Sequence, residues 1–167
     1  IFKLFKEQVR EKRPDFLIQT GDFIEGGAQT FKDRTEEINE ALSRFKELEI
    51  PIMFTKGSHE DEDNFYVKDK RDGYSKLLSH TEQNFKIKIG NKNYYQIIKN
   101  DCSFIIMDGY FSYPIDYLDY YNYYDWLYNA IKDSAKYKRR FLFVHEPLFP
   151  LYRPMVVKNY IKNTLAV

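Results

Sequence analysis

Apolar runs and amphipathic stretches alternate along the first third of the chain. Residues 16–18 form a short apolar run that Pro14 introduces and Gly21 closes, which is typical of a central strand covered on both faces. Residues 33–48 place apolar side chains at helical spacing, and residues 51–56 form a second apolar run. This order of strand, helix and strand predicts a βαβ unit with two parallel strands.

The rest of the pattern predicts a second sheet and further helices. Three helices are expected at residues 2–13, 73–79 and 155–163. Three strands of a meander, joined by tight turns, are expected at residues 85–89, 94–99 and 102–108. A last apolar strand is expected at residues 141–144. We therefore expect an α/β fold in which a two-sheet β-sandwich is flanked by helices.

Polar side chains follow three of the predicted strands directly. Asp22 follows the first strand, Ser58 and His59 follow the second, and His145 follows the last. If the three strands are parallel neighbours, these side chains gather at one rim, where the loops leaving the strands converge. Each alone has an ordinary explanation, such as a helix cap for Asp or a satisfied polar group for His. Their repetition at three strand ends favours a metal ion bound through oxygen and nitrogen.

Composition limits the classes of function. The chain has 167 residues, which suits a single domain, 1–167, with a substantial core. Lys and Arg total 26 against 25 acidic residues, and this balance gives no general reason to expect a nucleic-acid or membrane partner. No apolar run is long enough to cross a bilayer, so a cytoplasmic location is expected. Because the chain begins at Ile1, a signal peptide or a further domain upstream stays open.

Other single residues and runs receive simpler interpretations. Cys102 is expected to be a small core residue, and as the single cysteine it excludes a disulfide framework. His80 falls in a predicted polar turn and is given no role. The acidic run 60–63 reads most simply as a solvated loop, with support of a bound cation as the alternative. The basic run 136–140 also reads as solvated, and it favours phosphate or DNA only if it lies on the rim of His145.

A tyrosine-rich region extends from Tyr110 to Tyr128 and contains eight tyrosines. Tyrosine offers a large apolar face with a polar tip, so the region suits a protein partner or a platform for bases or sugars. The simpler interpretation is a helix that covers the core, followed or preceded by an irregular loop. Both interpretations stay open, with the helix favoured.

Three segments resemble the calcineurin-like metallophosphoesterases, a family that includes purple acid phosphatases, cyclic-nucleotide phosphodiesterases and nucleases of the Mre11 type. They are GDFIEGG at 21–27, GSHE at 57–60 and FVHEPL at 143–148, and the similarity covers nearly the whole chain. The resemblance implies a four-layer α/β/β/α domain. The family's first block, Asp-x-His, and its last, Gly-His-x-His, have no counterpart in the sequence, so the domain is expected to be truncated at both ends.

The resemblance also implies a reaction, the hydrolysis of phosphate esters by two metal ions such as Mn, Fe or Zn. By position, Asp22 would bridge the two ions and His145 would be a ligand of the second. His59 would contact the phosphate and help protonate the leaving oxygen, and Glu60 would support the site from outside the ligand shell. Ser58 stands where the family has an Asn ligand, and its shorter hydroxyl would weaken the second metal site.

The resemblance further narrows the substrate. Glu25, Gly26 and Gly27 stand where phosphoprotein phosphatases have an Arg, and no basic channel is visible. A small phosphomonoester or diester is therefore expected in preference to a phosphoprotein or DNA. Two alternatives stay open, a catalytically impaired relative that serves as a binding module and a nuclease of the Mre11 type.

Overall fold

The computed structural model describes residues 2–24, 31–57, 59–61, 72–89, 94–107 and 117–145. Its helices are α1 (Phe2–Lys12), α2 (Phe31–Lys46), α3 (Asp72–Phe85) and α4 (Tyr117–Asp133), with short 3₁₀ turns η1 (His59–Asp61) and η2 (Ser134–Lys136). Its strands are β1 (Leu17–Gln19), β2 (Ile52–Phe54), β3 (Tyr95–Lys99), β4 (Cys102–Ile106) and β5 (Arg139–Phe143). Among the helices described, none is both long enough and apolar enough to cross a membrane.

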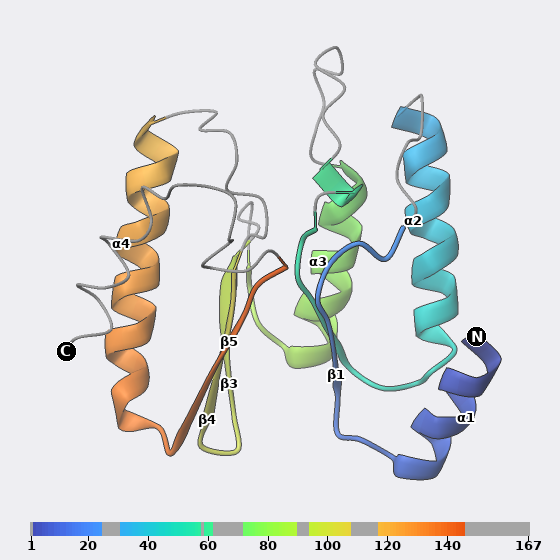
Figure 1. Ribbon diagram of the computed structural model, residues 1–167, viewed down its shortest axis with the longest axis horizontal. Coiled ribbons are helices and arrows are strands. Elements are labelled where there is room, and N and C mark those ends of the chain that lie inside the picture. The colour runs from blue at the N-terminus through green and yellow to red at the C-terminus, as the bar shows by residue number, and fades with distance from the viewer. Residues whose placement is uncertain are drawn as a thin grey trace, which may run out of the picture.

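Two sheets lie between layers of helix (Figure 1). In the first sheet β1 and β2 are parallel, with Ile18 opposite Met53, as the predicted βαβ unit requires. In the second sheet β4 is central, antiparallel to β3 and parallel to β5. Helices α2 and α3 pack on the first sheet, and α4 packs on the second. The predicted fold class, two sheets flanked by helices in an α/β/β/α order, is confirmed.

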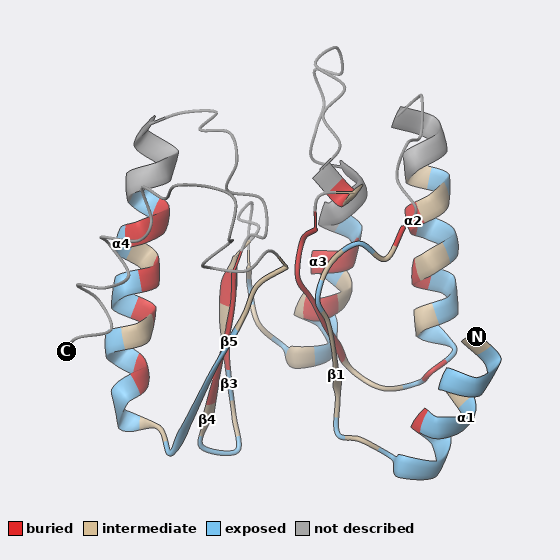
Figure 2. Ribbon diagram, in the orientation of Figure 1, coloured by how far each residue is buried: buried red, intermediate tan, exposed pale blue. Residues whose placement is uncertain are grey.

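The main core fills the space around β2 and between the sheets (Figure 2). All three residues of β2 are fully buried, and they share one hydrophobic cluster with Tyr95, Ile97, Phe104 and Ile106 of the second sheet. The apolar side chains predicted at helical spacing in residues 33–48 do face inward. Ile38 and Leu42 of α2 and Leu48, just past its end, are buried, and Phe45 packs against the cluster.

A second, smaller core lies on the opposite face of β4, beneath α4. There Ile105 and Met107 pack against Tyr123, Tyr124 and Leu127. Two tyrosines of the tyrosine-rich region are therefore core residues of a covering helix, which agrees with the simpler interpretation of that region. Residues 110–116, the first part of the region, lie outside the described residues.

The hydroxyl of Tyr95 covers part of the edge of β2 that faces away from β1. On the β1 side, Thr55 N–H donates to the Gln19 carbonyl at 2.8 Å. On the other side, the Tyr95 hydroxyl accepts from Phe54 N–H at 2.9 Å and donates to the Phe54 carbonyl at 2.8 Å. Burial raises the pKa of Tyr95 far above its usual value, so the phenol keeps the proton that it donates. One side chain thus satisfies two backbone groups where another strand would otherwise pair.

Three local predictions are wrong, and each failure has a physical cause. Residues 85–89 alternate in polarity like a strand, but Phe85 belongs to α3, which is much longer than the predicted 73–79. The helix ends at Phe85, before Lys86 with its positive φ of 54°, and the third strand of the second sheet is β5 instead. His80 therefore lies in α3 and not in a turn, with its ring 6.2 Å from that of Phe54.

Two predictions of burial are also corrected. The strand β1 is half-buried and not fully covered, and within the described part of the chain it pairs only with β2. A short apolar run occurs in both central and outer strands, so periodicity alone could not show whether β1 is covered on both faces. Cys102 begins β4 and packs against the main core, but it is half-buried and not fully enclosed. The predicted turn at Asn100 and Asp101 is confirmed by their positive φ angles of 51° and 58°.

The replacement Tyr95→Phe should destabilise the fold with little change of shape. It leaves the buried Phe54 N–H and carbonyl without their partner, at a cost of roughly 1–3 kcal/mol for each group. Urea unfolding of the variant measures this loss. The matched control is Tyr128→Phe, at a tyrosine 38% exposed on α4, which should change stability by less than about 0.5 kcal/mol. Equal stability of the two variants would contradict the role given to the Tyr95 hydroxyl.

Candidate active site

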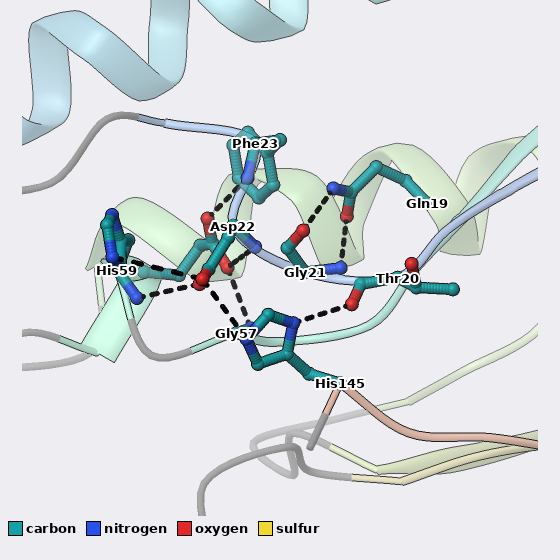
Figure 3. A network of polar contacts seen from close by, with 9 residues as sticks. Gln19, Thr20, Gly21, Asp22, Phe23, Gly57, His59 and His145 are labelled. Carbon is teal, nitrogen blue, oxygen red and sulfur yellow. Dashed lines mark hydrogen bonds and ion pairs between the residues drawn. The ribbon is translucent and has the colours of Figure 1, made fainter. Parts of the chain in front are cut away.

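Asp22 lies just past the end of β1, between two imidazole rings (Figure 3). Its Oδ2 is 3.1 Å from His145 Nε2 and 3.8 Å from His59 Nε2. Its Oδ1 accepts the backbone N–H of His59 at 3.0 Å. The structure thus brings together three of the four residues that the sequence singled out. Ser58, the fourth, lies outside the described residues.

The three residues reach the site from two different sheets. Asp22 follows β1 and His59 opens the turn after β2, so the first sheet positions both. His145 follows β5, which pairs with β4 in the second sheet. The expectation of three neighbouring parallel strands is therefore wrong, because β5 is separated from β1 and β2 by the core between the sheets. The residues still share one site, since the rims of the two sheets meet there (Figures 1 and 3).

Two glycines allow the backbone segments of the site to approach one another. A Cβ on Gly21 would lie 2.6 Å from His145 Nδ1 and 2.8 Å from the Cα of Gly57, and its φ of 94° suits glycine. A Cβ on Gly57 would collide with the backbone nitrogen and Oδ1 of Asp22. The glycines of the two motifs are thus required for close approach, and a side chain at either position would push Asp22 and His145 apart.

Glu60 joins the loop after β1 to the loop after β2. The residue is 4% exposed, and its carboxylate accepts three backbone N–H groups, from Asp22 at 2.8 Å, Phe23 at 2.9 Å and Gly57 at 2.7 Å. Burial raises the pKa of this carboxyl, and the three N–H donors oppose the rise because they favour the charged form. The interpretation of the run 60–63 as a solvated loop is wrong for Glu60. Residues 62 and 63 lie outside the described residues.

His145 has the arrangement usual for an imidazole that binds a metal ion. Its Nδ1 lies 2.9 Å from the carbonyl oxygen of Thr20, an acceptor only, so Nδ1 carries the proton of the neutral ring. The lone pair of Nε2 then faces Asp22 Oδ2, and two acceptors 3.1 Å apart repel unless a proton or a metal ion joins them. Ligating histidines generally donate their other N–H to a carbonyl or carboxylate in this way.

Asp22 and His145 therefore fit a metal ion as an oxygen and a nitrogen donor. Within the ranges that the structure describes, no three residues of the types His, Cys, Asp and Glu are grouped so that they could hold one ion. The donor pair Asp22 and His145 is thus what the described residues contribute. The side chain of His59 is 39% exposed and lies on the other side of the carboxylate, where a bound substrate could reach it.

The basic run 136–140 lies away from this site. Arg139 begins β5 and His145 follows its end, so the two are separated by the length of the strand, roughly 13 Å or more at 3.3 Å per residue. The condition under which this run would favour phosphate or DNA at the site is not met. Its residues at 139 and 140 are exposed, in line with the interpretation of a solvated segment.

The model of the calcineurin-like phosphoesterase family matches residues 1–164 of the chain. The chain belongs to this family. A comparison with curated proteins finds no match. Membership supports a general role in phosphate ester hydrolysis and a dependence on metal ions as a class, and the resemblance inferred from the three motifs is confirmed.

The variant Glu60→Gln should lower the stability of the fold. A carboxamide can present an oxygen to only one side of this pocket, so its NH₂ group faces at least one of the backbone N–H groups that Glu60 now binds. Leaving one buried donor unsatisfied costs roughly 1–3 kcal/mol, measurable by thermal or urea unfolding. As a control, Glu7→Gln on the exposed face of α1 should be neutral. If both variants unfold alike, the carboxylate of Glu60 does not hold the loops together.

Proposed function

We propose that this chain is the metal-binding portion of a phosphoesterase that hydrolyses small phosphate mono- or diesters with two metal ions. The observation that carries the proposal is the Asp22 carboxylate lying between His145 Nε2 and His59, with the proton of His145 held on Nδ1 by Thr20. Membership of the calcineurin-like phosphoesterase family supports the reaction class.

Each residue of the site has a defined task in this proposal. Asp22 and His145 would hold metal, with Asp22 bridging the two ions. Divalent ions, when bound, supply Lewis-acid stabilisation of the phosphoryl oxygens. His59, whose backbone N–H is fixed on Asp22 Oδ1, would contact the phosphate and protonate the leaving oxygen. Glu60 would act through the backbone, since its carboxylate is used by three N–H groups.

The proposed preference for small esters rests on charge and on sequence. The exposed arginines at 139 and 140 start β5, at the end opposite to His145, so they do not extend the site into a basic channel. Glu25, Gly26 and Gly27 follow the Asp22 loop in sequence, where phosphoprotein phosphatases would have an Arg. Faster cleavage of DNA ends than of aryl phosphates would assign the protein to the nuclease branch of the family instead.

The variants Asp22→Asn and His145→Ala test the proposed site in the full-length protein. Asp22→Asn removes the bridging charge and should reduce bound metal and phosphodiesterase activity by at least about 100-fold, because even outer-shell changes have effects of 10 to 100-fold. His145→Ala should release one ion first. Metal analysis and hydrolysis of an aryl phosphodiester, with and without added Mn²⁺ or Zn²⁺, measure both effects.

The control for this test is Asp133→Asn, at an exposed aspartate at the end of α4, which should retain metal and activity. Full activity of Asp22→Asn would contradict the proposed site. A wild-type protein that binds no metal and hydrolyses no ester would leave the non-catalytic binding module as the function, and the tyrosine-rich region from Tyr110 to Tyr128 would then be the first surface to test for a protein partner.

Ser58 gives a separate prediction, which rests on its sequence position between Gly57 and His59 of the site. If Ser58 is a poor ligand of the second ion, Ser58→Asn restores an amide oxygen and should tighten the weaker site by at least about 10-fold. Stepwise removal of metal with a mild chelator measures this affinity, and Ser79→Asn on the exposed side of α3 is the control. Unchanged metal content and activity in Ser58→Asn would show that the second ion, if bound, does not depend on position 58.

A further inference from the structure

His80 lies where α3 packs against the first sheet, and the candidate site makes no use of it. The residue is half-buried, and its ring lies 6.2 Å from the ring of Phe54 in β2. Its Nε2 atom is buried, and within the described part of the chain this atom has no hydrogen-bond partner. Such an atom is unusual, because buried polar groups are nearly always hydrogen-bonded. The helix thus presents an imidazole nitrogen to an apolar contact.

The two protonation states of His80 differ in how well they suit this contact. A neutral imidazole has one N–H, and with that hydrogen on Nδ1 only a lone pair remains on Nε2. The imidazolium carries an N–H on both nitrogens, so the buried Nε2 becomes a donor without an acceptor and part of a positive charge. At 6.2 Å, the ring of Phe54 lies just beyond the distance of about 6 Å within which an aromatic face attracts a cation. The contact therefore favours the neutral ring.

The charged groups near His80 also oppose its protonation. Lys46, the last residue of α2, repels a positive charge on the ring. On α3 itself, Lys76 stands one turn before His80, and its Nζ donates to Asn39 of α2 at 3.1 Å. Strand β2 contributes no charge, because its three residues are apolar. Burial and, to a smaller extent, Lys46 hold the pKa of His80 below its usual value.

The helix that carries His80 supports the strand that leads to the site. Thr81, the next residue of α3, donates its hydroxyl to the Ile52 carbonyl of β2 at 3.1 Å. Leu77, one turn earlier, is fully buried in the main core around β2. After β2 the chain continues into the turn that contains Glu60 (Figure 1). A weaker contact between α3 and β2 would therefore loosen the support of that turn.

We propose that His80 makes the packing of α3 on β2 and α2 sensitive to pH, so that acid weakens the contact behind the candidate site. The histidine of the unfolded chain has a pKa near 6.5, and the pKa in the folded protein is lower. Between these two values the unfolded state binds more protons, so stability is lost as pH falls through this window. The inference depends neither on metal binding nor on the proposed reaction.

The first measurement is the titration of the His80 ring, followed by NMR in the full-length protein. In wild type the pKa of His80 should lie below 6.5. Lys46→Glu replaces the repelling cation with an anion and should raise this pKa. Lys132→Glu, at an exposed lysine on α4, makes the same change of charge on a helix that covers the other sheet, and it should leave the pKa of His80 unchanged.

The second measurement is urea unfolding of wild type and His80→Phe between about pH 8 and about pH 5. Phenylalanine keeps an aromatic ring at the contact but takes up no proton. His80→Gln is a second variant without a titratable group at this position. Relative to both variants, the ratio of unfolded to folded wild type should rise as pH falls, by up to about tenfold per pH unit inside the window. All other titratable groups are common to the three proteins, so their effects cancel in this comparison.

Two results would overturn the inference. One is a pKa of His80 at or above 6.5 in the folded wild type. The other is the same pH dependence of unfolding in wild type, His80→Phe and His80→Gln. Equal pKa values of His80 in Lys46→Glu and Lys132→Glu would overturn the part given to α2, since the charge of Lys46 would then not act on the ring.

Discussion

The buried carboxylate of Glu60 is the interaction on which the site depends. The loops after β1 and β2 both arrive at the rim with backbone N–H groups that their strands do not satisfy, and a buried donor without a partner is costly. Glu60 accepts three of these groups, two from the loop after β1 and one from its own loop. Hydrogen bonds to a charged group contribute roughly 1.5–3 kcal/mol each. One side chain therefore holds two loops together and sets the backbone from which Asp22 projects.

Contacts between and within the two sheets also determine the geometry of the site. Tyr95 binds the backbone of Phe54 across the sandwich, and within the second sheet the ring of Phe104 on β4 stacks on Phe141 of β5 at a centroid distance of 5.3 Å. These contacts fix β5 relative to β2, and so they fix the distance of His145 from Asp22. Side chains in a packed core cannot shift independently, so the packing of the core determines how far His145 lies from Asp22. The metal ligands of the proposed function thus come from separate layers of the fold.

Much of this arrangement followed from the sequence. The parallel pairing of β1 and β2 was predictable because a helix-length segment with an apolar stripe at Ile38, Leu42 and Leu48 separates two apolar runs. The gathering of Asp22, His59 and His145 was predicted from their places after three predicted strands, although the assumed arrangement of three neighbouring parallel strands was wrong. The three motifs were also enough to indicate the family to which the chain belongs. These inferences rest on local order and spacing, which the sequence carries directly.

The tertiary structure determined the length of α3, the sheet to which β5 belongs and the partners of Glu60, because none of these is encoded in local sequence patterns. Residues 85–89 have the alternation of a strand, yet the helical packing of Leu77, Leu78 and Thr81 carries α3 through Phe85. The assignment of β5 to the second sheet depends on which strand it meets, and an apolar run does not specify its neighbour. The GSHE motif indicated Glu60 as support for the site, but the three backbone N–H groups that Glu60 binds are brought close only by folding. The sequence alone thus determined the elements, the family and the candidate residues. Only the folded structure determined the partners that fix them in place, because hydrogen bonds and packing depend on distances across the fold.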